Sequence, residues 1–107
     1  MAQEAVLFRE ALGEVLRAER MRRGLTLREL SGRARISLGY ISEVERGQKE
    51  ASSELLASLC EALEVGLGTV LRVVSDNIAE AEQMAAPAPA PITLPVGANS
   101  DVVASAA

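Results

Sequence analysis

Two short helical segments stand three residues apart near the middle of the chain. The run Thr26–Glu29 has the pattern of a capping box and predicts a helix over Leu27–Ala34. Ser37 is typical of an N-cap and predicts a second helix over Leu38–Arg46. The apolar residues expected to pack where these helices meet are Leu30, Ile36, Ile41 and Val44. The spacing is typical of a helix-turn-helix, although short paired helices also occur in other all-α domains.

The composition favours helices and excludes several kinds of chemistry. Hydrophobic residues make up 49% of the chain but aromatic residues only 2%, so the core must consist of Leu, Val, Ile and Ala. There is no histidine, and the single cysteine, Cys60, allows neither an internal disulfide nor a cysteine cluster for zinc. We therefore predict an all-α protein of the reducing cytoplasm that is not an enzyme and uses no metal or cofactor. Cys60 is expected to be a small core residue, with a redox sensor as the alternative.

Helical periodicity continues on both sides of this pair. Apolar residues at steps of three and four predict further helices over residues 8–23, 53–63 and 67–84. The last helix has the alternating spacing of a coiled-coil seam, so we expect it to pair two chains as a homodimer. The residues assigned to this dimer seam are Leu71, Val74, Ile78 and Ala81. The alternative is that the N-terminal part of the stripe closes the core of one monomer.

The last part of the chain differs in composition from everything before it. Alternating alanine and proline over residues 86–91 cannot continue a helix, and Asp101 is the last charged residue, so we expect a disordered tail. The predicted divisions are a helix-turn-helix domain over 8–72, a dimerising extension of the fifth helix over 73–85, and the tail over 86–107. Since no uncharged apolar run reaches the ~18–20 residues of a membrane span, we expect no membrane segment, and we expect no signal peptide.

Positive charge is concentrated in one segment of an acidic chain. The formal net charge is −4, yet residues 17–49 carry nine arginines and lysines against four glutamates. Residues 50–107 carry only Arg72 against eight acidic residues. A basic segment inside an acidic chain is expected if one face meets the phosphates of a nucleic acid. The alternative is an arginine-rich helix end that is simply solvated.

The run from Thr26 to Gly47, TLRELSGRARISLGYISEVERG, resembles the helix-turn-helix of the XRE, or Cro/cI-type, regulators. The matching positions are Thr26, Leu30, Ser31, Ile36, Ser37, Ile41, Ser42 and Glu45-Arg46-Gly47. The resemblance spans about Leu12 to Leu71 and implies a five-helix Cro/cI-like domain that binds double-stranded DNA. Two positions depart from the family pattern: Leu27 replaces a glutamine that often touches a phosphate, and Arg35 replaces the usual glycine of the turn.

A narrower resemblance comes from SLGYISEVERGQKEASSELLASLC with its flanking segments, which is similar to the Clp-gene regulators (ClgR-type activators) of actinobacteria. It implies an activator of Clp protease and stress genes, with RNA polymerase as a partner. The ending at Ala106 and Ala107 resembles the Ala-Ala ends recognised by Clp-type proteases, which implies turnover through the tail. The alternative to this degradation signal is a featureless alanine-rich tail.

The predicted recognition helix suggests roles for individual side chains. Its exposed candidates for contact with base edges are Ser37, Leu38, Gly39, Tyr40, Ser42 and Glu43. The candidates for phosphate contact are Arg28, Arg33, Arg35, Arg46 and Lys49. For Ser37 the alternative is an N-cap alone, and Glu43 either reads cytosine or turns away from the DNA. The family resemblance implies that Arg20 pairs with Glu45 and so orients the recognition helix.

A rival interpretation is an antitoxin-like interaction module that also binds DNA. The acidic C-terminal half and the tail would suit such a module. Its binding segment would have to lie in the tail, where the sparse apolar residues Ile92, Leu94, Val102 and Val103 give thin support.

Overall fold

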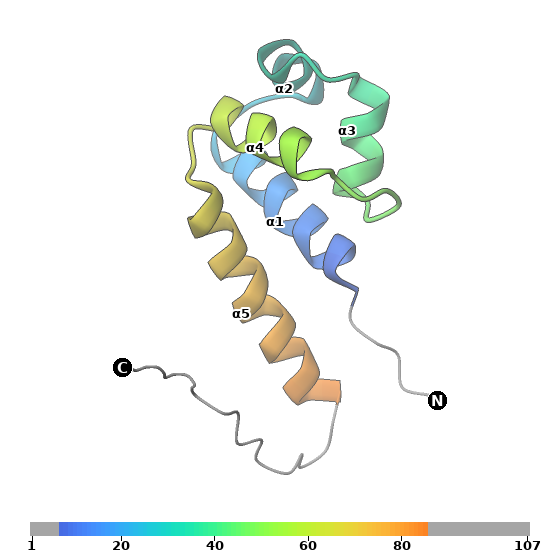
Figure 1. The fold of residues 1–107 in the computed structure, drawn as a ribbon, viewed down its shortest axis with the longest axis vertical. Helices are drawn as coiled ribbons and strands as arrows, with labels where there is room; N and C mark the ends of the chain where they lie inside the picture. The colour runs from blue at the N-terminus through green and yellow to red at the C-terminus, as the bar shows by residue number, and fades with distance from the viewer. Residues whose placement is uncertain (1–6, 86–107) are drawn as a thin grey trace.

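The computed structural model describes residues 7–85, which fold into five α-helices and no strand (Figure 1). The helices are α1 (Phe8–Arg22), α2 (Leu27–Ala34), α3 (Leu38–Glu45), α4 (Ser53–Ala62) and α5 (Leu67–Ala85). The predicted all-α class and all five helices are confirmed, and each predicted end lies within one residue of the observed end. The tail predicted over 86–107 lies outside the described residues.

Side-chain caps define where the short helices begin. Thr26 Oγ1 accepts a hydrogen bond from the backbone N–H of Glu29, and the Glu29 carboxylate accepts one from the backbone N–H of Thr26, which completes the predicted capping box. Ser37 and Ser52 each accept a hydrogen bond from the backbone N–H three residues later, at the start of α3 and α4. These contacts lie within four residues of the chain, which is why the sequence alone predicts them.

One hydrophobic core joins all five helices. In Figure 1, α1 runs through the middle of the molecule, with α5 along one side and the compact group α2–α4 on the other. Helix α1 packs against both α3 and α5, and α2 packs against α3 and α4. The side chains that are most completely buried are Leu12, Leu30, Ile41, Leu59, Leu63, Val44, Val70 and Val74. The core is therefore aliphatic, as the composition requires.

Gly13 allows α1 and α3 to approach closely. A Cβ atom at this position would lie 2.4 Å from the carbonyl oxygen of Val44 and 2.6 Å from that of Glu45. Any larger residue would collide with backbone atoms that cannot move independently of α3. This contact sets how α3 sits on the rest of the domain.

The structure corrects one residue of the predicted dimer seam. Val74 is only 1% exposed and belongs to the core of this chain, so it offers almost no surface to a second copy. Leu71 is 39% exposed, whereas Ile78 and Ala81 are half-buried. The stripe therefore divides between the monomer core and the surface, because α5 turns Val70 and Val74 towards α1.

Cys60 is buried in the core, with 2% of its surface exposed. Burial raises the pKa of its thiol, because a thiolate loses hydration in an apolar environment. The reactive thiolate is therefore disfavoured at neutral pH, which fits a packing role better than a sensing role. None of the helices within residues 7–85 combines the length and the apolar character needed to cross a membrane.

Candidate DNA-binding surface

A left-handed residue makes the turn between α2 and α3. Arg35 has φ 61° and ψ 41°, a conformation that glycine adopts without a steric penalty. The Ser31 hydroxyl donates to the carbonyl of Ile36 at 2.5 Å, and the Ile36 side chain is buried. Arg35 therefore holds the turn in the left-handed conformation, and the buried Ile36 side chain fixes the turn to the core.

A buried ion pair connects α1 to the end of α3. Arg20 Nε and Nη2 donate to the two oxygens of Glu45 at 2.7 and 2.9 Å, in a bidentate arrangement. Arg20 Nη1 also donates to the carbonyl of Leu25 at 2.9 Å. The pKa of Arg20 is raised by its hydrogen bonds to Glu45. The expected pairing is thus present. Because it joins α1 to Glu45 of α3, and only 4% of the Glu45 side chain is exposed, the pair fixes the orientation of α3 on the domain.

The outer face of α3 carries the residues proposed to meet base edges. Ser37 and Gly39 are exposed, whereas Ile41 and Val44 are buried against the rest of the domain. The remaining candidates are half-buried, namely Leu38, Tyr40, Ser42 and Glu43. Nothing lies within 4 Å of a Cβ atom built on Gly39, so this side of the helix is open to a ligand.

Several of these side chains have polar partners within the chain. The Tyr40 hydroxyl donates to the carbonyl of Glu50 at 2.6 Å, which ties α3 to the loop that follows it. Its ring packs at the edge of the core. Glu43 lies 3.7 Å from the ammonium group of Lys49, so its charge is partly offset. Tyr40 can still accept a hydrogen bond through its oxygen.

The five predicted phosphate contacts do not form one group. Arg28 is exposed in the first turn of α2, and Arg46 and Lys49 are exposed in the segment that follows α3. Arg33 and Arg35 instead line a depression together with two acidic residues, Glu61 of α4 and Glu64 of the turn that follows it. Nearby carboxylates weaken the attraction of such a surface for phosphate.

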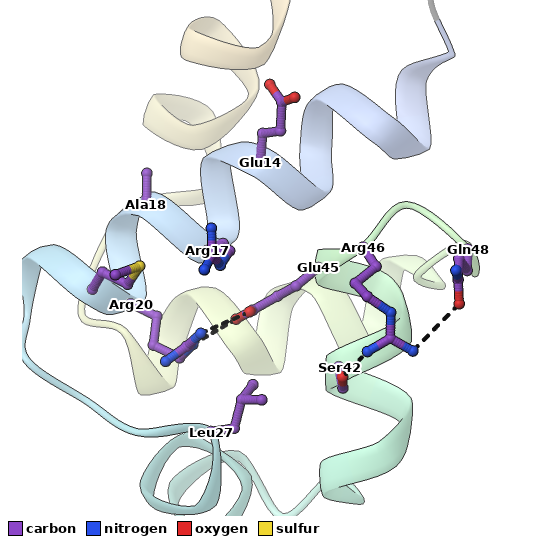
Figure 2. A pocket seen from close by; sticks show the side chains of 10 residues that line it. Glu14, Arg17, Ala18, Arg20, Leu27, Ser42, Glu45, Arg46 and Gln48 are labelled. Carbon is purple, nitrogen blue, oxygen red and sulfur yellow. Dashed lines mark hydrogen bonds and ion pairs between the residues drawn. The ribbon is translucent and has the colours of Figure 1, made fainter.

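A second group of residues surrounds the Arg20–Glu45 pair, and it includes Arg17, which was not among the site residues predicted from the sequence. A cleft of about 970 Å³ lies between α1, the start of α2 and the end of α3. Figure 2 shows Arg17 projecting from α1, with Arg46 beyond Glu45 on the far side of this pair. Arg46 donates to the Ser42 hydroxyl and, at 3.3 Å, to the Gln48 side chain. The sequence feature that could have identified Arg17 as a site residue is its position at the start of the basic segment, residues 17–49.

A further contact, which sequence reasoning did not find, fixes the loop after α3. Arg9 Nε donates to the carbonyl of Gly47 at 2.9 Å. Gly47 has φ 75° and would meet Glu10 if it carried a Cβ atom, which explains why glycine ends this helix. Among residues 7–85, no group of three or more His, Cys, Asp or Glu is placed to hold a metal ion.

Comparisons with known proteins agree with this geometry. Residues 11–73 match the family model described as a helix-turn-helix domain. The transcriptional regulator ClgR of Mycobacterium tuberculosis is 52% identical over 86 residues, which cover 80% of this chain and 77% of that protein. The chain belongs to the ClgR group of XRE-type helix-turn-helix regulators. The expected family is therefore confirmed, and the protein is a DNA-binding transcriptional regulator.

Solved structures show the same architecture. The crystal structure of the clp gene regulator ClgR from Corynebacterium glutamicum matches with a TM-score of 0.71 at 50% identity, over 76% of this chain and 87% of that chain. The restriction-modification controller protein C.Esp1396I, solved as a tetramer with its natural 35 base-pair operator, matches with a TM-score of 0.65. The two sequences are 20% identical, and the match covers 69% of this chain and 97% of that chain. This similarity therefore shows a shared fold and no more.

Proposed function

We propose that this regulator is a homodimer that activates Clp protease and stress genes. Each copy would bind the promoter DNA through its α3. The observation that carries the proposal is the 52% identity to ClgR of Mycobacterium tuberculosis over most of both chains. The 50% identity to a protein described as a clp gene regulator supports the same class of target genes. Activation further requires a contact with RNA polymerase, which is the proposed protein partner at the promoter.

The exposed side of α3 is the proposed reader of sequence. A single α-helix fits the major groove of DNA, and its N-terminal residues reach the base edges. Ser37 and Gly39 lie in that part of α3 and are exposed, and Leu38 can contact a thymine methyl group. Buried Ile41 and Val44 hold the opposite side of the helix to the core.

Helix α5 is the proposed dimer contact. Phe8, Leu71 and Ile78 line an apolar groove along α5, and Phe8 and Leu71 are 51% and 39% exposed. One helix-turn-helix reads a short half-site, and a second copy adds the free energy of the second half-site. A copy of the same chain would cover this groove through the same residues on each side.

The proposal includes turnover through the C-terminal segment. Ala106 and Ala107, the residues assigned to recognition by a Clp-type protease, lie outside the described residues. The support is their similarity to Ala-Ala ends that such proteases recognise, together with the proposed role in Clp gene expression. The test is the half-life after synthesis is blocked, for the native chain and for Ala106→Asp with Ala107→Asp. Equal half-lives in cells with an active Clp protease would remove turnover from the proposed function.

Promoter binding and transcription test the central proposal. The purified chain should bind duplexes from upstream of Clp protease genes at least about tenfold more tightly than a shuffled duplex at the same salt concentration. It should also increase transcription from those promoters by purified RNA polymerase. Equal binding to promoter and shuffled duplexes would contradict the assignment of target genes.

Gly39→Ala tests the role of α3 in the same assay. The added methyl group meets no protein atom within 4 Å, so the domain should fold normally, but it would stand between α3 and the bases. We expect about a tenfold or larger loss of promoter affinity. The matched control is Gly32→Ala, because Gly32 also lies in a helix with open space around it. Unchanged affinity for Gly39→Ala would exclude close approach of this part of α3 to the DNA.

A further inference from the structure

The cleft around the Arg20–Glu45 pair has two arginines on opposite sides. Arg17 belongs to the α1 side, and Arg46 follows α3 on the other side (Figure 2). Arg20 and Glu45 lie between these two arginines, and their opposite charges cancel through two hydrogen bonds. Within residues 7–85 no ion pair engages Arg17 or Arg46, although Glu14 also lines the cleft. The cleft therefore keeps an excess of positive charge.

Arg17 and Arg46 reach the lining of this cleft from different elements. Gly13 is one helical turn before Arg17 and touches the end of α3, and Arg20 is one turn after it and binds Glu45. Arg17 therefore projects from the stripe of α1 that faces α3, while its side chain is still exposed to solvent. Arg46 is held by hydrogen bonds to Ser42 and Gln48, which limit the positions of its guanidinium group.

The cleft continues the surface of α3 that is proposed to meet DNA. Ser42 belongs both to that surface and to the lining of the cleft. Leu27 lines the cleft at the start of α2, where the family pattern often has a glutamine that touches a phosphate. A leucine cannot make that hydrogen bond, whereas a guanidinium group can bind a phosphate with two N–H donors.

We propose that Arg17 and Arg46 form a clamp for one phosphate of the DNA backbone, in place of the hydrogen bond that Leu27 cannot donate. The inference rests on the proposed DNA-binding role of α3. The occupant is a phosphodiester of the DNA strand beside α3, because the cleft adjoins that helix and shares Ser42 with its outer surface. The clamp positions α3 in the groove and carries no sequence information of its own.

Salt-dependent binding to a mixed-sequence duplex gives the first test. Arg17→Ala should weaken binding about fivefold or more and reduce the slope of log affinity against log salt by about one. Arg17→Lys should keep the slope, because it keeps the charge. The matched control is Arg22→Ala, since Arg22 is an exposed arginine on the same helix that pairs with Glu19 and does not line the cleft. An Arg17→Ala slope equal to that of the wild type would overturn the clamp.

Neutral phosphates in the promoter duplex give the second test. Single methylphosphonate substitutions should reveal one position whose neutralisation weakens wild-type binding but has little further effect on Arg17→Ala. Such a non-additive effect is a coupling between the arginine and that phosphate. The same phosphate should be coupled to Arg46, when Arg46→Ala is tested, and should not be coupled to Arg22. Coupling of Arg17 and Arg46 to different phosphates, or to none, would overturn the inference. An error in the proposed target genes can be told apart from an error in the clamp. Arg17→Ala would still weaken binding to a duplex of mixed sequence if only the target genes were wrong.

Discussion

Within residues 7–85, two residues other than glycine have left-handed backbone conformations, and each follows a short helix. Arg35 with φ 61° ends α2, and Glu64 with φ 58° follows the end of α4. Gly24 and Gly47 adopt the same conformation after α1 and α3, with φ 71° and 75°. The left-handed conformation costs an L-residue with a Cβ atom about 1 kcal/mol relative to glycine. Arg35 and Glu64 therefore carry a conformational cost that Gly24 and Gly47 do not.

Replacing Arg35 by glycine should stabilise the domain. We expect Arg35→Gly to raise the free energy of unfolding by up to about 1 kcal/mol, measured by urea denaturation, because the turn is relieved of Cβ strain. The control is Arg35→Ala, which removes the same guanidinium group but keeps the Cβ atom and so should give no such gain. If both variants had the stability of the wild type, the left-handed turn would not be a source of strain. Comparing their DNA affinities also shows whether the Arg35 side chain contacts phosphate.

Glu19 holds together the arginine-rich end of α1. It accepts hydrogen bonds from Arg22 and, at 3.2 Å, from Arg23 Nε. Arg23 also donates to the backbone carbonyl of Glu64 at 2.9 Å, which connects this end of α1 to the turn after α4. These contacts, led by the hydrogen bond from Arg22, hold the pKa of Glu19 below its usual value despite its partial burial.

This lowered pKa predicts acid sensitivity. The contribution of Glu19 should be fully present above its unfolded pKa of about 4.5 and should be lost as the pH falls through the lower folded pKa. Glu19→Gln should therefore be less stable than the wild type at pH 7, and the difference should shrink as the pH falls below about 4.5. Urea denaturation over a pH series measures this. A difference that stayed constant with pH would mean that the Glu19 charge does not contribute.

At the scale of elements, the position of α3 depends on its contact with α1. The two helices meet at Gly13, where a Cβ atom would lie 2.4 Å from the carbonyl oxygen of Val44. Two turns further along α1, Arg20 bonds Glu45. The recognition helix is therefore held by one close backbone contact and one buried ion pair, both from the same stripe of α1.

Gly13→Ala should separate these two helices. We expect a net loss of about 2 kcal/mol or more in the free energy of unfolding, because overpacking against backbone outweighs the gain in helix propensity. Gly32→Ala is the control: its methyl group meets nothing within 4 Å, so only the helix propensity should change, with a gain of up to about 1 kcal/mol. Thermal or urea unfolding of the two variants measures the difference. A stable Gly13→Ala variant would mean that α3 can move outward without cost.

At the scale of the whole molecule, α5 both closes the core of the monomer and leaves apolar side chains on the surface. Its N-terminal half buries Val70 and Val74 against the core, and its last turns extend beyond the rest of the domain (Figure 1). Leu71 and Ile78 border an apolar groove with Phe8, while Val73 lies on the opposite side of α5 in a separate groove. One helix thus closes the monomer and leaves an apolar surface for the proposed second copy.

Sedimentation should separate these roles. Leu71→Glu with Ile78→Glu should convert the proposed dimer to a folded monomer, because two carboxylates would be buried in the interface. Val73→Glu is the control and should remain dimeric, since Val73 is 42% exposed and does not border that groove. Val74→Glu should instead unfold the chain, because Val74 is buried in the core. A Leu71→Glu, Ile78→Glu variant that stayed dimeric would exclude this side of α5 as the interface.

The sequence by itself determined the helices and their ends. Thr26, Ser37 and Ser52 cap the helices through contacts with backbone atoms three residues away, so local pattern was sufficient. Periodicity also predicted which sides of α2 and α3 face the core. The Arg20–Glu45 pair joins residues 25 positions apart, and it was expected only through the family resemblance.

Only the tertiary structure decided which surfaces these helices share. It placed Val74 in the core, set Arg33 and Arg35 near Glu61 and Glu64, and brought Arg17 and Arg46 to one cleft. Periodicity shows that a helix has an apolar side, but it does not show which neighbour covers that side. That choice depends on how α1, α3 and α5 cross, and the crossing depends on contacts such as Gly13 with Val44, between residues far apart in the sequence.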